Sequence, residues 1–579
     1  MYLFKQNNNS RSAARAKALS VFFFLFSVVI IARLFVLQVI EHKYYSDIAS
    51  NTHEIYKTLR PERGSVFFQD TRSGKEYPAA VNKIYYEIFA VPAEIKKEEV
   101  TEIVENLSEF FQYSEELKTE LVLKLSKDND PYEPIAKKID DETMKKIQEM
   151  NLSGIHFAEQ EYRFYPENNI ASTVVGFTKL NDSGELDGSY GVEGYWNDIL
   201  KGKEGFLSGE RGARGNWIYS AGRTVEQAEN GAELVLTIDR TLQFKACERL
   251  RQGMETYKAK SASLILMNPY TGAIIAMCSL PDFDPNNYAD NKEMSAFNNS
   301  TIFTPYEPGS VFKPITMAIA LDLELVSPGT TFTDPGVREI DGFKIHNALD
   351  KNYGVQTMTG VLENSINTGM IWVVEKIGRE KFKEYVDKFG FGKKTGIGLD
   401  TEVAGDVSQL ENKGKIYSAV ASFGQGVTVT PLQIATAFSA LANGGQIFKP
   451  YIIDEIRYAN GKTEKTKSQP SDTVISTRAS KLITGMLVSV IEKGHGVNAK
   501  LEHYYMAGKT GTAQIPGKGG YTEETNHTFL GFAPSENPKF VLLVKYEAPQ
   551  RQWAESTVAP VFKDIAALTL DYYGVKEEK

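Results

Sequence analysis

Hydrophobic and polar positions divide the chain into three stretches of different texture. Residues 18–40 are almost continuously apolar, residues 41–234 alternate charged helical patterns with short strand-like runs, and residues 235–579 combine apolar strands with helices. Apolar residues three or four apart predict amphipathic helices, whereas alternation or short apolar runs predict strands. We therefore expect a multi-domain protein of the α+β or α/β class that follows an N-terminal hydrophobic segment.

The first apolar stretch predicts a membrane anchor. Ala18–Ile40 is long enough to cross about 30 Å of hydrocarbon as a helix, and Arg33 lies near its far end, where its side chain can reach the interface. Residues 1–17 carry basic but no acidic side chains, so the positive-inside rule places this tail in the cytoplasm and the rest outside. No small-x-small cleavage site follows, which favours an uncleaved anchor over a signal peptide. The charge asymmetry argues against a buried core helix.

The next stretch, residues 41–234, has a mixed pattern and is taken as one domain. Residues 41–60 are polar and compatible with a helical stalk, whereas residues 82–92 alternate like a strand. Residues 93–151 are rich in lysine and glutamate with apolar residues at helical spacing, which predicts solvated amphipathic helices. Residues 186–230 are glycine-rich, which predicts loops.

The texture changes at Leu234, so we place a domain boundary near residue 235. The segments LVLTID, SASLILMN and GAIIAMC predict strands joined by tight turns, and Thr241–Tyr257 predicts a helix. The second domain then covers residues 235–579.

Composition refines this picture only slightly. A length of 579 residues suits three or four domains or two large ones, and 42% hydrophobic and 24% charged residues are typical of globular chains. A net charge of −9 lacks the excess of basic residues that is typical of nucleic-acid-binding proteins. Cys247 and Cys278 are too few for a disulfide framework or a cysteine zinc site. Their sparseness suits an extracytoplasmic bacterial protein.

The first chemical motif is Ser310-Val311-Phe312-Lys313, the single S-x-x-K run of the chain, followed by an apolar helical stretch. A serine hydroxyl is a poor nucleophile unless a base removes its proton. Residues three apart share a helix face, so Lys313 is placed to act as that base if burial and cationic neighbours lower its pKa. The alternative is a helix N-cap followed by a surface lysine.

The second motif is Ser365-Ile366-Asn367. A hydroxyl and a carboxamide two residues apart on a bent loop can both face a cleft. The spacing is a weak signal, because Ser535-Glu536-Asn537 matches it too. A helix N-cap is an equally good interpretation of this motif taken alone.

The third motif is Lys509-Thr510-Gly511-Thr512, which follows a predicted strand at residues 504–507. A lysine and two hydroxyls on a strand can bind a carboxylate, and glycine allows close approach of a ligand. A second run, Lys394-Thr395-Gly396, follows dense glycines and is interpreted as a structural loop. A phosphate-binding loop ending at Thr510 would need glycine where the chain has His503, so the nucleotide-binding interpretation fails.

These three motifs in this order are those of penicillin-binding proteins and class A β-lactamases. With YEPGSVFKP, ENSINTGM, AGKTGTAQ and residues 422–445, the chain resembles a class B, monofunctional penicillin-binding protein, a peptidoglycan D,D-transpeptidase. RGSVFFQD resembles the start of the family's pedestal or dimerisation domain. One departure is Gln69-Asp70-Thr71-Arg72, at a place where members of the family often have a shorter turn. GAELVLTIDRTLQ resembles the entrance to its transpeptidase domain. The resemblance implies a pedestal over 41–234 and, over 235–579, a β-lactamase-like antiparallel sheet flanked by helices.

The resemblance also implies a role for each motif residue. Ser310 is expected to attack the penultimate D-Ala carbonyl of a stem peptide, Lys313 to accept its proton, and Ser365 to relay a proton to the leaving amine. Asn367 is expected to hold the donor peptide. The residues expected to bind the terminal carboxylate are Lys509, Thr510, Gly511 and Thr512. The backbone N–H groups of Ser310 and Thr512 are expected to form the oxyanion hole.

The same resemblance implies the setting of the reaction. An amine of a neighbouring stem peptide is expected to resolve the acyl-enzyme, and no metal or organic cofactor is expected. Expected partners are stem peptides, β-lactams, a membrane glycosyltransferase and division or elongation proteins, with a homodimer as one assembly and no nucleic acid. Length and SFGQGVTVTPLQ resemble the division subgroup more than the elongation subgroup. The expected location is the bacterial cytoplasmic membrane.

Rival enzymes lack their signatures here. A class A β-lactamase requires a glutamate for deacylation, and the chain has no E-x-x-L-N match. H-E-x-x-H of a β-lactam receptor and E-D-x-x-F of a bifunctional synthase are also missing from the sequence. Two alternatives stay open: a catalytically silent scaffold for wall synthesis, and a D,D-carboxypeptidase or β-lactamase-like serine hydrolase. The presence of every motif residue argues against the scaffold.

Overall fold

The computed structural model describes residues 9–40, 54–127, 130–181, 184–210 and 224–579. The chain forms two compact units. One consists of Met1–Pro61 and Gly202–Asn230, the other of Glu62–Lys201 and Gly231–Lys579. The N-terminal hydrophobic segment therefore belongs to the smaller unit, and all three chemical motifs belong to the larger one.

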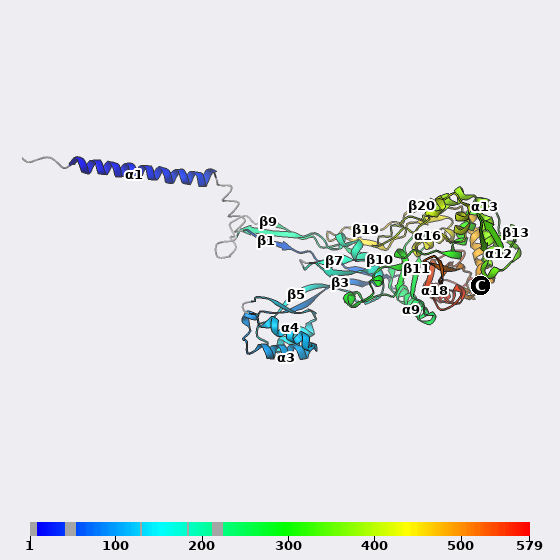
Figure 1. The fold of residues 1–579 in the computed structure, drawn as a ribbon, viewed down its shortest axis with the longest axis horizontal. Coiled ribbons are helices and arrows are strands. Elements are labelled where there is room, and N and C mark those ends of the chain that lie inside the picture. Colours follow the sequence, from blue (N-terminus) through cyan, green and yellow to red (C-terminus); the bar gives the residue numbers. More distant parts are fainter. Residues whose placement is uncertain (1–8, 41–53, 128–129, 182–183, 211–223) are drawn as a thin grey trace, which may run out of the picture. The chain divides into compact units, whose positions relative to one another are not determined.

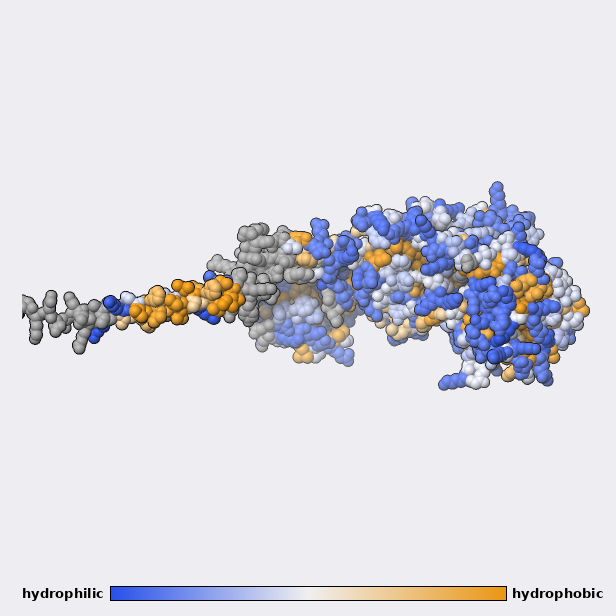
Figure 2. All heavy atoms as spheres, turned by 90° about the horizontal axis from the view of Figure 1, so that it is seen from above, coloured by the Kyte–Doolittle hydropathy of each residue, from blue (hydrophilic) through white to orange (hydrophobic). Residues whose placement is uncertain are grey.

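The smaller unit begins with a long apolar helix. Helix α1 (Asn9–Phe35) continues into a π-helical turn at Val36–Ile40. Its segment Lys17–Ile40 has a mean hydropathy of 2.6 and none of it is buried, and Figure 2 shows the band of apolar side chains along it. By length and composition this helix can cross a membrane.

A three-stranded antiparallel sheet completes the smaller unit. Its order is β1 (Glu54–Leu59), β8 (Gly205–Glu210) and β9 (Thr224–Glu226). The predicted helical stalk is therefore wrong over β1, and the predicted loop is wrong over β8 and β9. Strand β1 pairs with β8, which lies far away in the sequence. A local pattern of polar and apolar residues does not reveal such a partner. Residues 41–53 and 211–223 of these predictions lie outside the described residues.

A seven-stranded sheet of the larger unit combines five strands from residues 66–239 with two strands from residues 453–465. Its order is β19-β18-β10-β2-β3-β4, and β5 also pairs with β3. The strands are β2 (Val66–Asp70), β3 (Lys75–Ala90), β4 (Glu133–Ile139), β5 (Ile155–Phe164), β10 (Glu233–Asp239), β18 (Ile453–Arg457) and β19 (Thr463–Lys465). The predicted strand at 82–92 lies mostly within β3. Residue 235 lies in the middle of β10, which pairs with β2 on one side and β18 on the other.

Three amphipathic helices pack beside β3 and β4. They are α3 (Val100–Phe111), α4 (Glu115–Leu125) and α5 (Asp141–Glu149). Val100, Ile103 and Leu107 form the buried stripe of α3, as their helical spacing predicts. The prediction of helices throughout 93–151 is wrong at β4, where pairing with β3 determines the strand.

A buried ion cluster holds the start of β2 against the segment after β5. Arg63 and Arg163 both bind the carboxylate of Glu193, at 2.6 and 2.7 Å, and all three side chains are almost fully buried. Arg163 also donates to Gly64 O at 2.7 Å. The short elements around this cluster are α6 (Ser172–Val175), β6 (Phe177–Leu180), β7 (Leu186–Ser189), α7 (Gly191–Tyr195) and α8 (Asn197–Leu200).

The larger unit also contains a five-stranded antiparallel sheet with helices on both faces (Figure 1). Its order is β12 (Ile274–Leu280), β11 (Ser261–Met267), β23 (Phe540–Glu547), β22 (Gly520–Ala533) and β21 (Ala507–Gly517). Leu264 and Leu266 pack with α9 (Arg240–Tyr257) and α18 (Val558–Tyr572). Ile265 and Met267 belong to the core on the opposite face. Successive residues of a strand point to opposite faces, so a doubly covered sheet needs an apolar run rather than alternation. This confirms the α+β class and the predicted sheet flanked by helices.

The core on the second face is mainly helical. Its helices are α10 (Ser300–Phe303), α11 (Lys313–Asp322), α12 (Met358–Glu363), α13 (Asn367–Ile377), α14 (Arg379–Lys388), α15 (Lys415–Ala421), α16 (Pro431–Ala442) and α17 (Thr477–Lys493). A lobe of short strands lies between α11 and α12: β13 (Thr331–Asp334), β14 (Val337–Ile340), β15 (Phe343–His346) and β16 (Gly354–Thr357). Strands β17 (Gln446–Phe448) and β20 (Pro470–Thr473) form a separate pair.

Candidate active site

The three sequence motifs meet at one cleft of about 400 Å³ between the edge strand β21 and the helical core. Five of the predicted site residues line it: Ser310, Ser365, Asn367, Thr510 and Thr512. Lys313 and Lys509 are fully buried immediately behind this lining. The fold thus brings together side chains that are far apart in the sequence.

Ser310 lies in a 3-10 turn, Gly309–Phe312, that leads directly into α11. In such a turn residues three apart are stacked on one face, which places Lys313 at the first residue of α11 behind Ser310. Ser365 Oγ donates a hydrogen bond to Ser310 Oγ at 3.0 Å, and Lys313 Nζ donates to Ser365 Oγ at 3.1 Å. Ser365 therefore connects the nucleophile to the lysine.

In its protonated form Lys313 serves three acceptors, all from the second motif. Its Nζ donates to Ser365 O at 2.5 Å and to Asn367 Oδ1 at 2.7 Å, in addition to Ser365 Oγ. Burial, helped by the positive charge of Lys509, holds the pKa of Lys313 well below its usual value. A buried lysine with a lowered pKa can be neutral and so accept a proton near neutral pH.

The backbone of the second motif is bent as the sequence analysis supposes. Ser365 has a left-handed φ of 54°, between the end of α12 and the start of α13. Asn367 is the first residue of α13, so this motif also marks a helix N-terminus. A non-glycine residue in this conformation is strained, and such strain often accompanies function.

The third motif lies within β21 rather than after it. The strand predicted at 504–507 begins only at Ala507, the first residue of β21. Residues 509–512 lie near the start of β21, where it pairs with β22. Burial lowers the pKa of Lys509 to about 7, opposed by the nearby charge of Glu555. A Cβ at Gly511 would meet Val311 Cγ1 at 3.0 Å. A side chain here would crowd the Ser310 turn, so glycine favours the close packing of β21 against it.

The second Lys-Thr-Gly run lies away from this cleft. Lys394 is exposed. The backbone N–H and hydroxyl of Thr395 both donate to Glu402 Oε1 at 2.6 Å, and Gly396 N donates to Glu402 Oε2 at 3.0 Å. These bonds close a local loop on a buried carboxylate.

The cleft also has lining residues that the motifs did not indicate. They are contributed by the lobe, by the loop after α15, by the segment after α17 and by the segment before α18: Ala348, Leu349, Lys351, Tyr353, Phe423, Gln425, His495, Trp553, Ala554 and Glu555. Phe423 and Gln425 belong to the quoted segment 422–445. The others have no sequence signal of their own, because only the fold brings them to the cleft.

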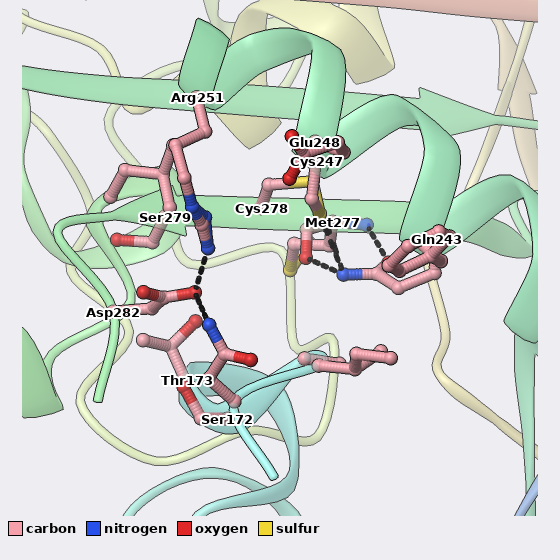
Figure 3. A pocket seen from close by; sticks show the side chains of 15 residues that line it. Ser172, Thr173, Gln243, Cys247, Glu248, Arg251, Met277, Cys278, Ser279 and Asp282 are labelled. Carbon is pink, nitrogen blue, oxygen red and sulfur yellow. Dashed lines mark hydrogen bonds and ion pairs between the residues drawn. A yellow bond between two sulfur atoms is a disulfide. The ribbon is translucent and has the colours of Figure 1, made fainter. Parts of the chain in front are cut away.

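A second cavity, of about 140 Å³, lies where α9 and β12 meet the segment before α6 (Figure 3). A disulfide joins Cys247 to Cys278, whose Cα atoms are 5.7 Å apart across 31 residues of sequence. Gln243 bonds both the N–H and the carbonyl of Met277, each at 2.8 Å. These interactions fasten α9 to the outer strand of the sheet. Local sequence does not predict this disulfide, because the pairing of Cys247 with Cys278 depends on the packing of α9 on β12.

Comparison with protein families gives two matches along the chain. Residues 58–236 match the Penicillin-binding Protein dimerisation domain, and residues 262–567 match the Penicillin binding protein transpeptidase domain. Stage V sporulation protein D of Bacillus subtilis is 34% identical over 96% of this chain and 86% of its own length. Peptidoglycan D,D-transpeptidase FtsI of Escherichia coli is 30% identical over 74% of this chain and 70% of its own length.

Solved structures share the fold. Penicillin Binding Protein 2X from Streptococcus thermophilus superposes with a TM-score of 0.73 at 21% identity, over 89% of this chain and 80% of that one. Penicillin binding protein 3 from Mycobacterium tuberculosis, in complex with aztreonam, gives 0.69 at 24% identity, over 90% of this chain and 98% of that one.

Proposed function

Because this chain belongs to the penicillin-binding protein family and is an enzyme of its serine transpeptidase kind, we propose that it cross-links peptidoglycan stem peptides through an acyl-enzyme on Ser310. The observation that carries the residue assignment is the hydrogen-bonded chain from Ser310 through Ser365 to Lys313. This chain supplies the base that a serine nucleophile requires.

Acylation begins when Ser310 Oγ attacks the penultimate D-Ala carbonyl of the donor stem peptide. Its proton passes to the neutral amine of Lys313, directly or through the hydroxyl of Ser365. The carbonyl carbon gains the ester bond to Oγ and loses its bond to the terminal D-Ala nitrogen, which takes up the proton through Ser365. The low pKa of Lys313 supports this role, since a base must be unprotonated before it acts.

Strand β21 supplies the residues that bind the donor stem peptide. Lys509, Thr510, Gly511 and Thr512 bind the terminal carboxylate of the donor. As an edge strand, β21 has backbone N–H groups that its sheet does not use. The amide of Thr512 and the amide of Ser310 stabilise the oxyanion of the tetrahedral intermediate, where preorganised donors act most strongly. Thr512 Oγ1 accepts from Ala554 N at 3.1 Å, which holds the cleft wall beside it.

Deacylation uses an amine of a second stem peptide. The amine attacks the ester carbonyl, the bond to Ser310 Oγ breaks, and the proton of the amine returns to Oγ through Ser365 and Lys313. Asn367 holds the donor peptide during both steps, fixed by Lys313 Nζ and by its own bond to His346 O at 2.9 Å. Attack by water instead would make the protein a D,D-carboxypeptidase, and failure to acylate would make it a scaffold.

The proposed membrane arrangement has residues 1–17 in the cytoplasm, residues 18–40 as a single-pass anchor, and both remaining domains outside. The apolar surface of α1 supports the anchor, and the basic flank supports the orientation. The matches to the dimerisation and transpeptidase domains support a pedestal over 41–234 and a catalytic domain over 235–579. The proposed partners are a membrane glycosyltransferase that makes the glycan strands, division proteins and a second copy of this chain.

Names of the relatives favour septal wall synthesis as the pathway, since several are FtsI homologues. A second candidate is wall synthesis during spore formation, which the name of the Bacillus subtilis relative favours. A fluorescent fusion at the septum of dividing cells supports the first candidate. Signal confined to sporulating cells supports the second.

The activity is tested with the full-length protein, lipid-linked glycan and a labelled amine acceptor. Cross-linked dimer that depends on Ser310 is the expected product. Release of D-Ala without dimer would support the carboxypeptidase alternative, and no release with intact folding would support the scaffold.

A further inference from the structure

Asp334, at the end of β13, carries four hydrogen bonds although no motif includes it. Its Oδ1 accepts from Thr368 Oγ1 and from Gly336 N at 2.9 Å. Its Oδ2 accepts from Asn347 Nδ2 at 2.9 Å and from Tyr353 N at 2.8 Å. The side chains of Asp334, Asn347 and Thr368 are all buried, so this is a closed network inside the lobe.

The network joins the start of α13 to one wall of the cleft. Thr368 follows Asn367 at the start of α13, and its backbone N–H donates to Asn347 Oδ1 at 3.1 Å. Asn347 precedes the segment that lines the cleft, and its Nδ2 also donates to Lys351 O at 3.0 Å. Asn367 itself spans the two parts, because it contacts Lys313 on one side and His346 O on the other.

The wall that Asp334 holds is strained. Leu349 and Asp350 have left-handed φ values of 58° and 53°, and neither is glycine. Leu349 is apolar, 76% exposed, and lines the cleft. Such a conformation persists only when the surrounding structure fixes it. The bonds of Asn347 and Asp334 at both ends of this turn provide that restraint.

The chemistry of the network requires a carboxylate. Each oxygen of Asp334 accepts from one backbone N–H, Gly336 on Oδ1 and Tyr353 on Oδ2, and a backbone N–H cannot become an acceptor. An asparagine at this position would turn its NH₂ group toward one of these donors, whichever way it is oriented. Burial favours the neutral acid, but the bonds from Thr368, Gly336, Tyr353 and Asn347 outweigh it and lower the pKa of Asp334.

We propose that Asp334 is a positioning residue for acyl transfer: it fixes the start of α13, and through it Asn367 and Lys313, relative to the cleft wall at residues 346–353. The inference rests on the proposed role of this cleft in acyl transfer. Asp334 does not touch the reacting atoms. It acts through Thr368 and Asn347, so its loss displaces groups that the reaction needs without removing the nucleophile.

The test is Asp334→Asn in the full-length protein, acylated by a fluorescent penicillin. The dissociation constant of the initial complex and the rate constant of acylation are measured separately, and mass spectrometry locates the adduct. We expect the acylation rate constant to fall at least about tenfold, because misplaced catalytic groups lower the rate of the chemical step. The adduct should still form at Ser310. An acylation rate constant equal to that of the wild-type protein would overturn the proposal.

Glu402→Gln is the matched control. Glu402 is also a buried carboxylate, with three hydrogen bonds from Thr395 and Gly396, but it lies in the loop away from the cleft. It should lower thermal stability while leaving acylation within about twofold of wild type. Equal slowing by both changes would show that acylation follows stability alone, and would refute a positioning role.

If Asp334→Asn does not fold, Thr368→Val and Thr368→Ser replace it. Valine keeps the size of Thr368 but removes its bond to Asp334, whereas serine keeps the hydroxyl. We expect slow acylation with valine and near-normal acylation with serine. Equal rates for the two variants would overturn the proposal. Failure of the proposed function is seen separately, as absence of the Ser310 adduct in the wild-type protein.

Discussion

Ser365 Oγ lies 3.0 Å from Ser310 Oγ and donates a hydrogen bond to it, although 55 residues separate the two serines. Lys313 Nζ lies 3.1 Å from the same Ser365 Oγ, so the three side chains form one continuous path for a proton. Ser365 of this path and Lys509 of the third motif each have a counterpart of matching local sequence outside the cleft, Ser535 and Lys394, so the assignment is open to direct tests.

Ser310→Ala should abolish covalent labelling by a fluorescent penicillin, because no other hydroxyl occupies the start of the path. The change removes one hydroxyl at the cleft surface, so the temperature of thermal unfolding should stay nearly unchanged. Labelling is followed by gel fluorescence, with the adduct located by mass spectrometry. Persistent labelling at another residue would contradict the assignment of the nucleophile.

Ser365→Ala should slow acylation by about 10²-fold or more, the range seen when a positioned proton-transfer group is lost. The bond from Lys313 to Ser365 O uses the backbone and survives the change. Ser535→Ala is the matched control, since Ser535-Glu536-Asn537 has the same spacing and Ser535 is not among the cleft residues. The measurement is the second-order rate constant of acylation, and similar slowing by both changes would refute the proton path.

Lys509→Ala should slow penicillin acylation by about thirty-fold or more, because a buried cation that meets a carboxylate is typically worth about 2–5 kcal/mol. Lys394→Ala should slow it by less than about three-fold, since Lys394 is exposed in the loop closed by Glu402. Both variants are compared at the same pH after thermal unfolding has shown that they fold. A larger effect at Lys394 would require a carboxylate site near residues 391–398 instead.

The pH dependence of acylation should be bell-shaped. Acylation rises with pH as Lys313 loses its proton, because the neutral amine is the base. It falls above about pH 7, where Lys509, whose pKa burial lowers to about 7, loses the charge that binds the carboxylate. In Lys509→Arg the cation persists at all these pH values, so the falling limb should move to higher pH. Identical falling limbs in the two proteins would mean that Lys509 does not cause it.

The free energy of unfolding should depend on pH through a third buried lysine, Lys545, whose Nζ lies 5.0 Å from the centre of the Tyr306 ring. Burial lowers its pKa to about 8, opposed by Glu547. Between about pH 8 and 10.5 the unfolded chain holds a proton that the folded protein has released. The free energy of unfolding therefore gains about 1.4 kcal/mol per pH unit from this group as pH rises. Lys545→Met should remove that contribution, measured by urea unfolding across this pH range, and equal slopes for the two proteins would be the contrary result.

Much of this protein is determined by its sequence at short range. The almost continuously apolar run over residues 18–40 specifies a long helix, since no polar face is present for it to place toward water. The strands β10, β11 and β12 and helix α9 follow from apolar runs and periodicity that need no distant partner. The spacing within each of the three motifs also predicts which of its side chains lie on the same face, because helices and strands repeat with fixed periods.

The contacts between these local elements depend on the folded arrangement of the whole chain. The pairing of β1 with β8 turned a predicted helical stalk into a strand, and the packing of α9 on β12 joined Cys247 to Cys278. Gly511 favours the close packing of β21 on the Ser310 turn, and Asp334 gains its significance from four donors in three separate segments. Pairing, packing and burial depend on groups that are distant in sequence, and local patterns of hydrophobicity carry no information about those partners.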